Sequence, residues 1–121
     1  MNHRQVIQGS LDYIEANLKT DQSAQELASL AGYSLFHYYR LFQSATGMSV
    51  MQYILRRKLL HSIYEISRGY KRIDVIGCYG FDTYSGFYKA FLREFGCTPT
   101  DYLKKNRAKK PYRVNLCQEE H

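Results

Sequence analysis

Residues 27–34, LASLAGYS, decide the fold because they end one helix and begin another within a single turn. Gly32 can adopt the positive φ that a tight turn requires, and Ser34 is a typical N-cap for the helix that follows. Before this stretch, Ser23 and Glu26 have the spacing of a capping box, which predicts the start of the short helix. A short helix, a glycine turn and a longer helix are the layout of a helix-turn-helix unit.

A similar pattern occurs a second time in the chain. Residues 75–82, VIGCYGFD, align with residues 27–34 at an offset of 48, and residues 89–102 align with residues 40–53 at an offset of 49. Each copy contains a short helix, a glycine, an aromatic residue, a capping residue and a longer helix, with Asp82 in the capping position of the second copy. Such an internal repeat indicates two copies of one structural unit. On geometry alone, the repeat fits either two helix-turn-helix units or a duplicated helical hairpin that does not bind DNA.

The rest of the chain also predicts helices. Ile7, Leu11, Ile14 and Leu18 form one apolar stripe, which predicts a helix over about residues 3–19. Further helices are expected over about residues 34–45, 50–68, 73–79, 83–95 and from 98 onward. No segment long enough for a strand alternates apolar and polar residues with a period of two, so the sequence predicts an all-α domain.

Composition and charge favour one folded domain with a polyanionic partner. A chain of 121 residues with 45% hydrophobic content fits one folded domain. Its net charge of +6 and pI near 9.3 favour a polyanionic partner. No apolar run approaches the ~18 residues that span a bilayer, so no membrane partner is expected. Without an apolar N-terminal signal segment, we expect a cytoplasmic, nucleoid-associated protein.

The sequence contains no pattern that predicts a catalytic or metal site. No phosphate-binding loop and no catalytic triad order is present, so we expect no enzyme activity and no cofactor. Cysteines and histidines lack metal-ligand spacing, so no metal site is expected, and the thiols should be reduced. These residues are Cys78, Cys97, Cys117, His3, His37, His61 and His121.

The two copies resemble one known family. Residues 28–57, with the pattern A-x3-GYS, RLF-x3-TG-x-S-x3-YI-x2-R, resemble the first half of the DNA-binding domain of AraC/XylS transcription regulators. Residues 80–102, GF-x5-F-x3-F-x3-FG-x-TP-x2-Y, are similar to that family's C-terminal signature. The resemblance covers about residues 5–105. It implies a seven-helix, double helix-turn-helix domain.

The resemblance also implies the domain organisation. The DNA-binding domain is expected over residues 1–106, followed by a basic tail or linker at 107–121 that would lead to an effector domain in a longer protein. Within the domain, the helix-turn-helix units are expected at about residues 23–47 and 73–96. A linker helix over about residues 49–68 is expected to join them.

The resemblance implies sequence-specific binding to double-stranded DNA by a bacterial transcription regulator. Both recognition helices are expected in successive major-groove segments of a promoter site, with RNA polymerase as a further partner. An effector ligand is expected only if an additional domain exists. The alternative is a helical protein-protein interaction module that uses exposed aromatic residues. Salt dependence separates the two, because phosphate contacts release counterions.

Family positions predict which side chains contact DNA. An arginine can form two parallel hydrogen bonds with guanine, and an aromatic ring can pack on a thymine methyl group. The expected base contacts are Phe36, Tyr39, Arg40, Tyr84, Ser85, Tyr88 and Lys89. The expected contacts to the DNA backbone are Ser34, Gln43, Thr83 and Arg56.

The two recognition helices should differ in how they bind. Lysine is a point charge and tyrosine offers one hydroxyl, so the second helix should depend more on the DNA backbone and shape than on bases. Ile76-Gly77 departs from the family pattern at the position of Ala28 in the first copy, and Gly86 is expected in the middle of a helix. Arg57 is expected to be internal.

Overall fold

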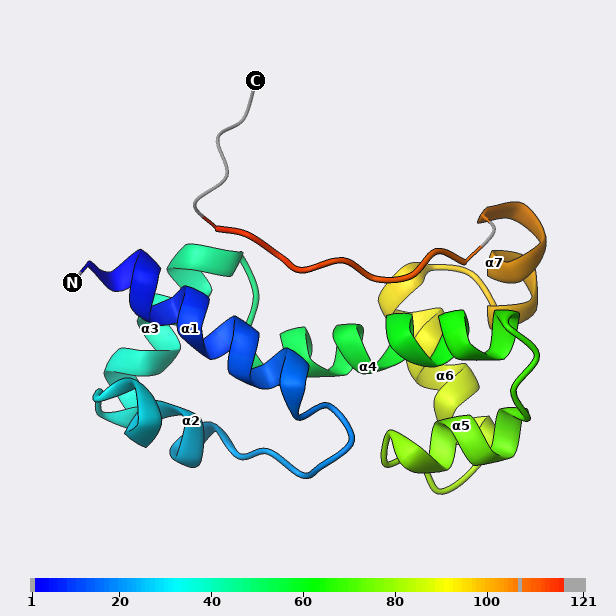
Figure 1. The fold of residues 1–121 in the computed structure, drawn as a ribbon, viewed down its shortest axis with the longest axis horizontal. Coiled ribbons are helices and arrows are strands. Elements are labelled where there is room, and N and C mark those ends of the chain that lie inside the picture. The colour runs from blue at the N-terminus through cyan, green and yellow to red at the C-terminus, as the bar shows by residue number, and fades with distance from the viewer. Residues whose placement is uncertain (1, 107, 117–121) are drawn as a thin grey trace. The chain divides into compact units, whose positions relative to one another are not determined.

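The structure is a computed structural model that describes residues 2–106 and 108–116 (Figure 1). Its helices are α1 (His3–Ala16), α2 (Ala24–Ala31), α3 (Leu35–Thr46), α4 (Val50–Ser67), α5 (Arg72–Cys78), α6 (Tyr84–Phe95) and α7 (Pro99–Asn106). No strand occurs in the described part of the chain. The prediction of an all-α fold with seven helices is confirmed. Across those described ranges, no helix is both long enough and apolar enough to cross a membrane.

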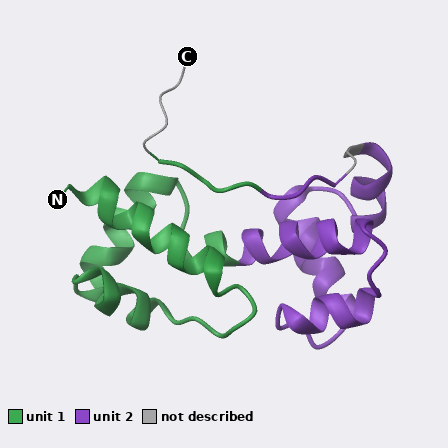
Figure 2. Cartoon of the chain, in the orientation of Figure 1, with its two compact units in different colours: residues 1–54, 112–121 green, residues 55–111 purple. Residues whose placement is uncertain are grey.

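The chain divides into two compact units (Figure 2). Unit 1 consists of residues 1–54 and 112–121, and unit 2 consists of residues 55–111. Helix α4 therefore contributes its first residues to unit 1 and the remainder to unit 2. Each unit contains one helix-turn-helix pair, α2 with α3 or α5 with α6.

Unit 1 has a core built on the predicted stripe of α1. Ile7, Leu11, Ile14 and Leu18 are all buried, and α1, α2 and α3 each pack against the other two. Helix α1 ends at Ala16, earlier than the apolar spacing predicts. The reason is local: the next residue leaves the helical conformation, and its side-chain amide donates to a carbonyl of the last turn. Leu18 reaches the core from the turn.

Two aromatic residues of α3 complete this core. Tyr38 and Phe42 are fully buried, whereas the neighbouring Leu41 is half-buried. The hydroxyl of Tyr38 donates to Ser10 Oγ at 3.0 Å, which satisfies its hydrogen-bonding need in the interior. Burial raises the pKa of Tyr38 above its ordinary value, because ionisation there would leave a charge with little water around it.

The helix-turn-helix of unit 1 forms as the sequence predicts. Ser23 Oγ accepts from the backbone N–H of Glu26 at 3.1 Å and starts α2. Gly32 ends α2 with φ of 82°, in the left-handed region that favours glycine. Ser34 Oγ then accepts from the backbone N–H of His37 at 3.2 Å and starts α3. These caps fix where the recognition helix begins.

The helix-turn-helix of unit 2 differs at its turn. The N-cap of α6 is Thr83, whose Oγ1 accepts from the backbone N–H of Gly86 at 3.0 Å, and not Asp82 as the repeat alignment suggests. The cap thus follows the turn glycine by three residues here and by two in unit 1. The extra residue of the second copy lies in the turn, because an offset of 49 holds from the cap onward.

Unit 2 has its own hydrophobic core. It consists of Leu59, Ile63, Ile76, Phe87, Ala90 and Phe91, from α4, α5 and α6. Ile76 is fully buried and Gly77 beside it is exposed, so the isoleucine that departs from the family pattern fills core volume. Phe81, the aromatic residue of the turn, packs edge-on against Phe87 with ring centroids 5.4 Å apart. It closes the corner between α5 and α6.

The described end of the tail is held against α1. Residues 113–116, called the strap below, hydrogen-bond to Arg4, Gln8 and Asp12, which lie one helical turn apart. Arg113 donates two hydrogen bonds to the Asp12 carboxylate at 2.9 and 3.0 Å. Gln8 accepts from the Leu116 N–H at 2.7 Å and donates to the Val114 carbonyl at 2.8 Å. Residue 107 and residues 117–121 of the expected tail lie outside the described residues.

Candidate nucleic-acid interface

The outward face of α3 carries the residues predicted to read bases. The side chains of Phe36 and Tyr39 are 70% and 41% exposed, and Arg40 and Gln43 are exposed as well. On the opposite face, Tyr38 and Phe42 are completely buried. A helix with one face locked into a core presents the other in a fixed orientation, which is what recognition of base edges requires.

Arg40 and Phe36 form a pair on this face. They are four residues apart, so they lie one above the other on the helix. The Arg40 Cζ atom lies 5.6 Å from the centroid of the Phe36 ring, within range of a cation–π interaction. A guanidinium stacked by its face keeps its N–H edges available, and these are the groups that bind guanine or phosphate.

The N-terminus of α3 contains Ser34, one of the residues predicted to contact the DNA backbone. Its side chain is exposed and caps the helix through His37. His37 is itself exposed and contacts Tyr33 and His3, with ring centroids 5.0 and 6.0 Å away. This aromatic cluster therefore lies at the surface and not in the core. No group of three or more potential metal ligands occurs in the described ranges.

The predicted contact residues on the outward face of α6 are weaker base readers than those of α3. Ser85, Tyr88 and Lys89 are exposed, and Phe87 and Phe91 are fully buried on the opposite face. The groups of these three predicted contacts are one hydroxyl, one phenol and one ammonium. None of them can form the planar two-bond contact that an arginine forms with guanine.

Tyr84 is placed differently from the other predicted base contacts. Its side chain is half-buried and packs on the core of unit 2, with its ring centroid 5.7 Å from that of Phe87. Its ring also lies under the guanidinium of Arg72, a residue of α5. This ring is thus held against the unit rather than projecting from it.

The repeat aligns the outward positions of the two recognition helices. At an offset of 49, Phe36, Tyr39, Arg40 and Gln43 correspond to Ser85, Tyr88, Lys89 and Leu92. Leu92 is 42% exposed, but it is absent from the contacts predicted above. The signal that identifies it is the offset itself, which converts each outward position of α3 into one on α6.

Arg56 is already engaged within unit 2. Its guanidinium donates to the Glu94 carbonyl at 2.9 Å, pairs with the Glu94 carboxylate at 3.5 Å, and lies 4.5 Å from the centroid of the Phe95 ring. These contacts hold α4 to the C-terminal end of α6. Its neighbour Arg57 is buried, as expected. The Arg56 side chain therefore has a structural role that its place in the basic run Arg56-Arg57-Lys58 does not reveal.

Gly86 lies in the first turn of α6 and not in the middle of a helix. It is the third residue after the Thr83 cap, and its N–H is the group that the cap binds. A Cβ atom at this position would lie 3.3 Å from Thr83 Oγ1, which is a tight contact. A side chain at this position would therefore have to pack closely against the cap.

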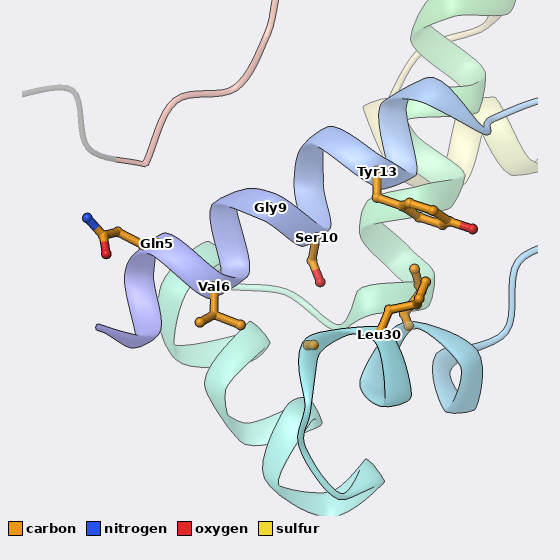
Figure 3. Close-up of a pocket in the computed structure, with 8 residues that line it drawn as sticks. Gln5, Val6, Gly9, Ser10, Tyr13 and Leu30 are labelled. Atoms are coloured by element: carbon orange, nitrogen blue, oxygen red, sulfur yellow. The ribbon is translucent and has the colours of Figure 1, made fainter. Parts of the chain in front are cut away.

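A groove in unit 1 lies between α1 and α2 (Figure 3). Its lining is mostly apolar, with Val6, Gly9, Leu27 and Leu30 among its residues. No charged side chain lines it. It therefore lacks the positive charge that dominates binding to DNA phosphates, and we do not include it in the interface.

Comparison with known proteins agrees with this geometry. A family model described as a helix-turn-helix domain matches residues 11–105. The regulatory protein SoxS of Salmonella typhimurium is 30% identical over 103 residues, which cover 84% of this chain and 96% of SoxS. The chain belongs to the AraC family of helix-turn-helix transcription regulators. Its function is sequence-specific binding to DNA in the regulation of transcription.

Further relatives differ in length from this AraC-family chain. The transposon Tn10 TetD protein of Escherichia coli is 33% identical, over 87% of this chain and 76% of TetD. The transcriptional regulator Rob of Salmonella typhimurium is 31% identical over 88% of this chain, which spans only 37% of Rob. A crystal structure of an AraC-type regulator from Chromobacterium violaceum shares the fold, with a TM-score of 0.71 at 22% identity over 81% of this chain and 90% of that one.

Proposed function

We propose that this regulator inserts α3 and α6 into the major groove of promoter DNA and reads bases mainly through α3. The observation that carries the proposal is the Arg40–Phe36 pair, exposed on a helix whose opposite face is buried. Arg40 would donate two hydrogen bonds to a guanine, and Phe36 and Tyr39 would pack on thymine methyl groups. Such contacts are typically worth about 1–3 kcal/mol of base discrimination each.

Helix α6 would contribute affinity more than base discrimination. Ser85, Tyr88 and Lys89 are exposed on its outward face and would contact base edges weakly. The backbone contacts would come from Ser34, Gln43 and Thr83, which lie at the starts or on the outward faces of the recognition helices. We leave Arg56 out of the interface because its guanidinium is engaged by Glu94 and Phe95.

The domain organisation and the partners follow from the same proposal. We assign residues 1–106 to the DNA-binding domain, with residues 107–121 as a tail whose strap supports α1. RNA polymerase is proposed as a further partner, since one relative, AarP of Providencia stuartii, is named a transcriptional activator. An effector ligand would act only in a longer protein, of which Rob is an example by length.

The test begins with selection of bound sites from a random duplex library. Affinity for the selected duplex and for an unrelated duplex is then measured by fluorescence anisotropy across a range of salt concentrations. We expect affinity for both duplexes to fall steeply with salt, and the selected duplex to bind at least 10³-fold more tightly. Affinity that stays flat between low and moderate salt would exclude DNA binding and favour a protein-interaction module.

The role of Arg40 is tested by two substitutions. Arg40→Ala should relax the selected motif at one position and weaken specific binding by about 5- to 150-fold, the equivalent of 1–3 kcal/mol. Arg40→Lys keeps the charge but loses the planar fork, so it should retain nonspecific affinity while losing the base preference. An unchanged motif with Arg40→Ala would contradict the assignment.

A further inference from the structure

The start of α5 differs in charge from the start of α2. At an offset of 48, Lys71 and Arg72 correspond to Ser23 and Ala24. In unit 1 the first residue of the short helix is a buried alanine, whereas in unit 2 it is an exposed arginine. The repeat thus places a guanidinium on the first helix of one helix-turn-helix and a methyl group on the other.

Arg72 is held in place by Tyr84. The Arg72 Cζ atom lies 5.5 Å from the centroid of the Tyr84 ring, and its Nη1 lies 3.4 Å from the Tyr84 hydroxyl. The ring is in turn packed on the core of unit 2 beside Phe87. A guanidinium stacked on an anchored ring loses less conformational freedom when it binds a ligand than a free side chain does.

Both units therefore present an arginine stacked on an aromatic ring, but they build the pair differently. In unit 1 both members, Arg40 and Phe36, belong to the recognition helix. In unit 2 the corresponding positions of α6 hold Lys89 and Ser85, which cannot form such a pair. There the guanidinium comes from α5.

We propose that Arg72 is a DNA-contacting residue that binds a backbone phosphate beside the groove entered by α6, and that Tyr84 positions Arg72 instead of reading a base. The first helix of a helix-turn-helix crosses the DNA backbone when the second enters the groove, so a side chain at its start can reach a phosphate. The planar guanidinium matches a phosphate with two parallel hydrogen bonds, while its face stays on the ring. The inference rests on the DNA binding proposed above.

The test measures equilibrium binding of the full chain to the selected duplex and to an unrelated duplex, by fluorescence anisotropy at several salt concentrations. Arg72→Ala should weaken binding to both duplexes by the same factor, about tenfold, because a phosphate contact carries no sequence information. The slope of log affinity against log salt should fall by about 1. Lys105→Ala is the matched control, since it removes one exposed positive charge from α7, which lies well apart from α5 (Figure 1).

The role of Tyr84 is tested by a double-mutant cycle. Tyr84→Leu keeps an apolar side chain on the core but removes the platform, so it should weaken binding to both duplexes, and adding it to Arg72→Ala should cause little further loss. Tyr84→Phe keeps the ring and should bind nearly as the wild type does. Thermal unfolding of each variant checks that the fold is retained.

Three results would overturn the inference. If Arg72→Ala binds both duplexes with the wild-type affinity and salt slope, Arg72 does not contact DNA, while the proposed function stands. If the loss is confined to the selected duplex and its motif changes, Arg72 reads a base instead of a phosphate. If the wild type itself shows no salt-dependent duplex binding, the proposed function fails and the inference fails with it.

Discussion

Replacing Gln8 with alanine should release the strap from α1 and show how much the tail stabilises unit 1. The Gln8 side chain is only 8% exposed, and its amide makes two hydrogen bonds with the strap, to the Val114 carbonyl and the Leu116 N–H. The alanine variant removes both bonds at once. It leaves in place the hydrogen bonds that Arg4 and Arg113 make between the strap and α1.

The size of the effect follows from these contacts. The variant also loses the hydrogen bond from Gln8 to Asp12 at 3.1 Å, and at about 1 kcal/mol net each the three bonds set an upper limit near 3 kcal/mol. Two effects reduce it: the freed strap groups regain water, and alanine favours a helix slightly more than glutamine does. We expect the free energy of unfolding to fall by about 1 kcal/mol and Tm to fall by about 4 °C.

The assay combines thermal unfolding with hydrogen exchange of the Leu116 amide, which reports on the strap alone. Gln5→Ala is the matched control, because Gln5 is exposed on the same helix and undergoes the same change in helix propensity. Faster exchange of Leu116 only in the Gln8 variant would support the reasoning. Equal Leu116 exchange in the wild type and Gln8→Ala, together with an unchanged Tm, would refute it.

Three further predictions concern stability and binding. Tyr38→Phe removes a buried hydroxyl and its hydrogen bond, so chemical denaturation should show a loss of about 1 kcal/mol. The hydrogen bonds from Arg113 hold the pKa of Asp12 below its ordinary value. The stability that this pair contributes is therefore present above about pH 4 and is lost as pH falls through the lowered pKa. It should amount to less than about 1 kcal/mol because both side chains are half-exposed, and Arg113→Ala should remove this pH dependence from denaturation curves. Phe36→Ala should change stability by no more than about 0.5 kcal/mol while weakening DNA binding, whereas Phe87→Ala should cost about 3–5 kcal/mol of stability. A large destabilisation by Phe36→Ala would place that ring in the core instead of the interface.

Features determined by neighbouring residues could be predicted from the sequence. The caps at Ser23 and Ser34 and the turn at Gly32 depend on contacts within four residues, and all of them form as expected. The buried stripe of α1 follows from its spacing of three and four residues. The repeat then extends the same assignment to α5 and α6.

Features determined by distant residues could not be predicted. The strap bonds to side chains more than 100 residues away, and no local pattern in residues 113–116 indicates which helix face they meet. In the sequence, Arg56 is one member of the basic run Arg56-Arg57-Lys58. Its environment in the fold depends on Glu94, which lies 38 residues further along the chain. Tyr84 has the spacing of a groove-facing residue, and only the packing of unit 2 shows that its ring is held against the core.

The asymmetry of the two units lies in their turns as well as in their side chains. From glycine to cap, the turn in unit 2 is one residue longer than in unit 1, and the cap changes from Ser34 to Thr83. The positions after each cap remain in register, so the outward faces of α3 and α6 still correspond residue by residue. The first helices do not correspond in chemistry, because α5 alone begins with an exposed arginine stacked on its recognition helix. Unit 2 lacks arginine at the base-reading position of its recognition helix. It can thus still present a guanidinium to DNA, but this group would bind the DNA backbone and not a base. The second unit would then fix the position of the regulator on the duplex, and the first would decide which duplex it binds.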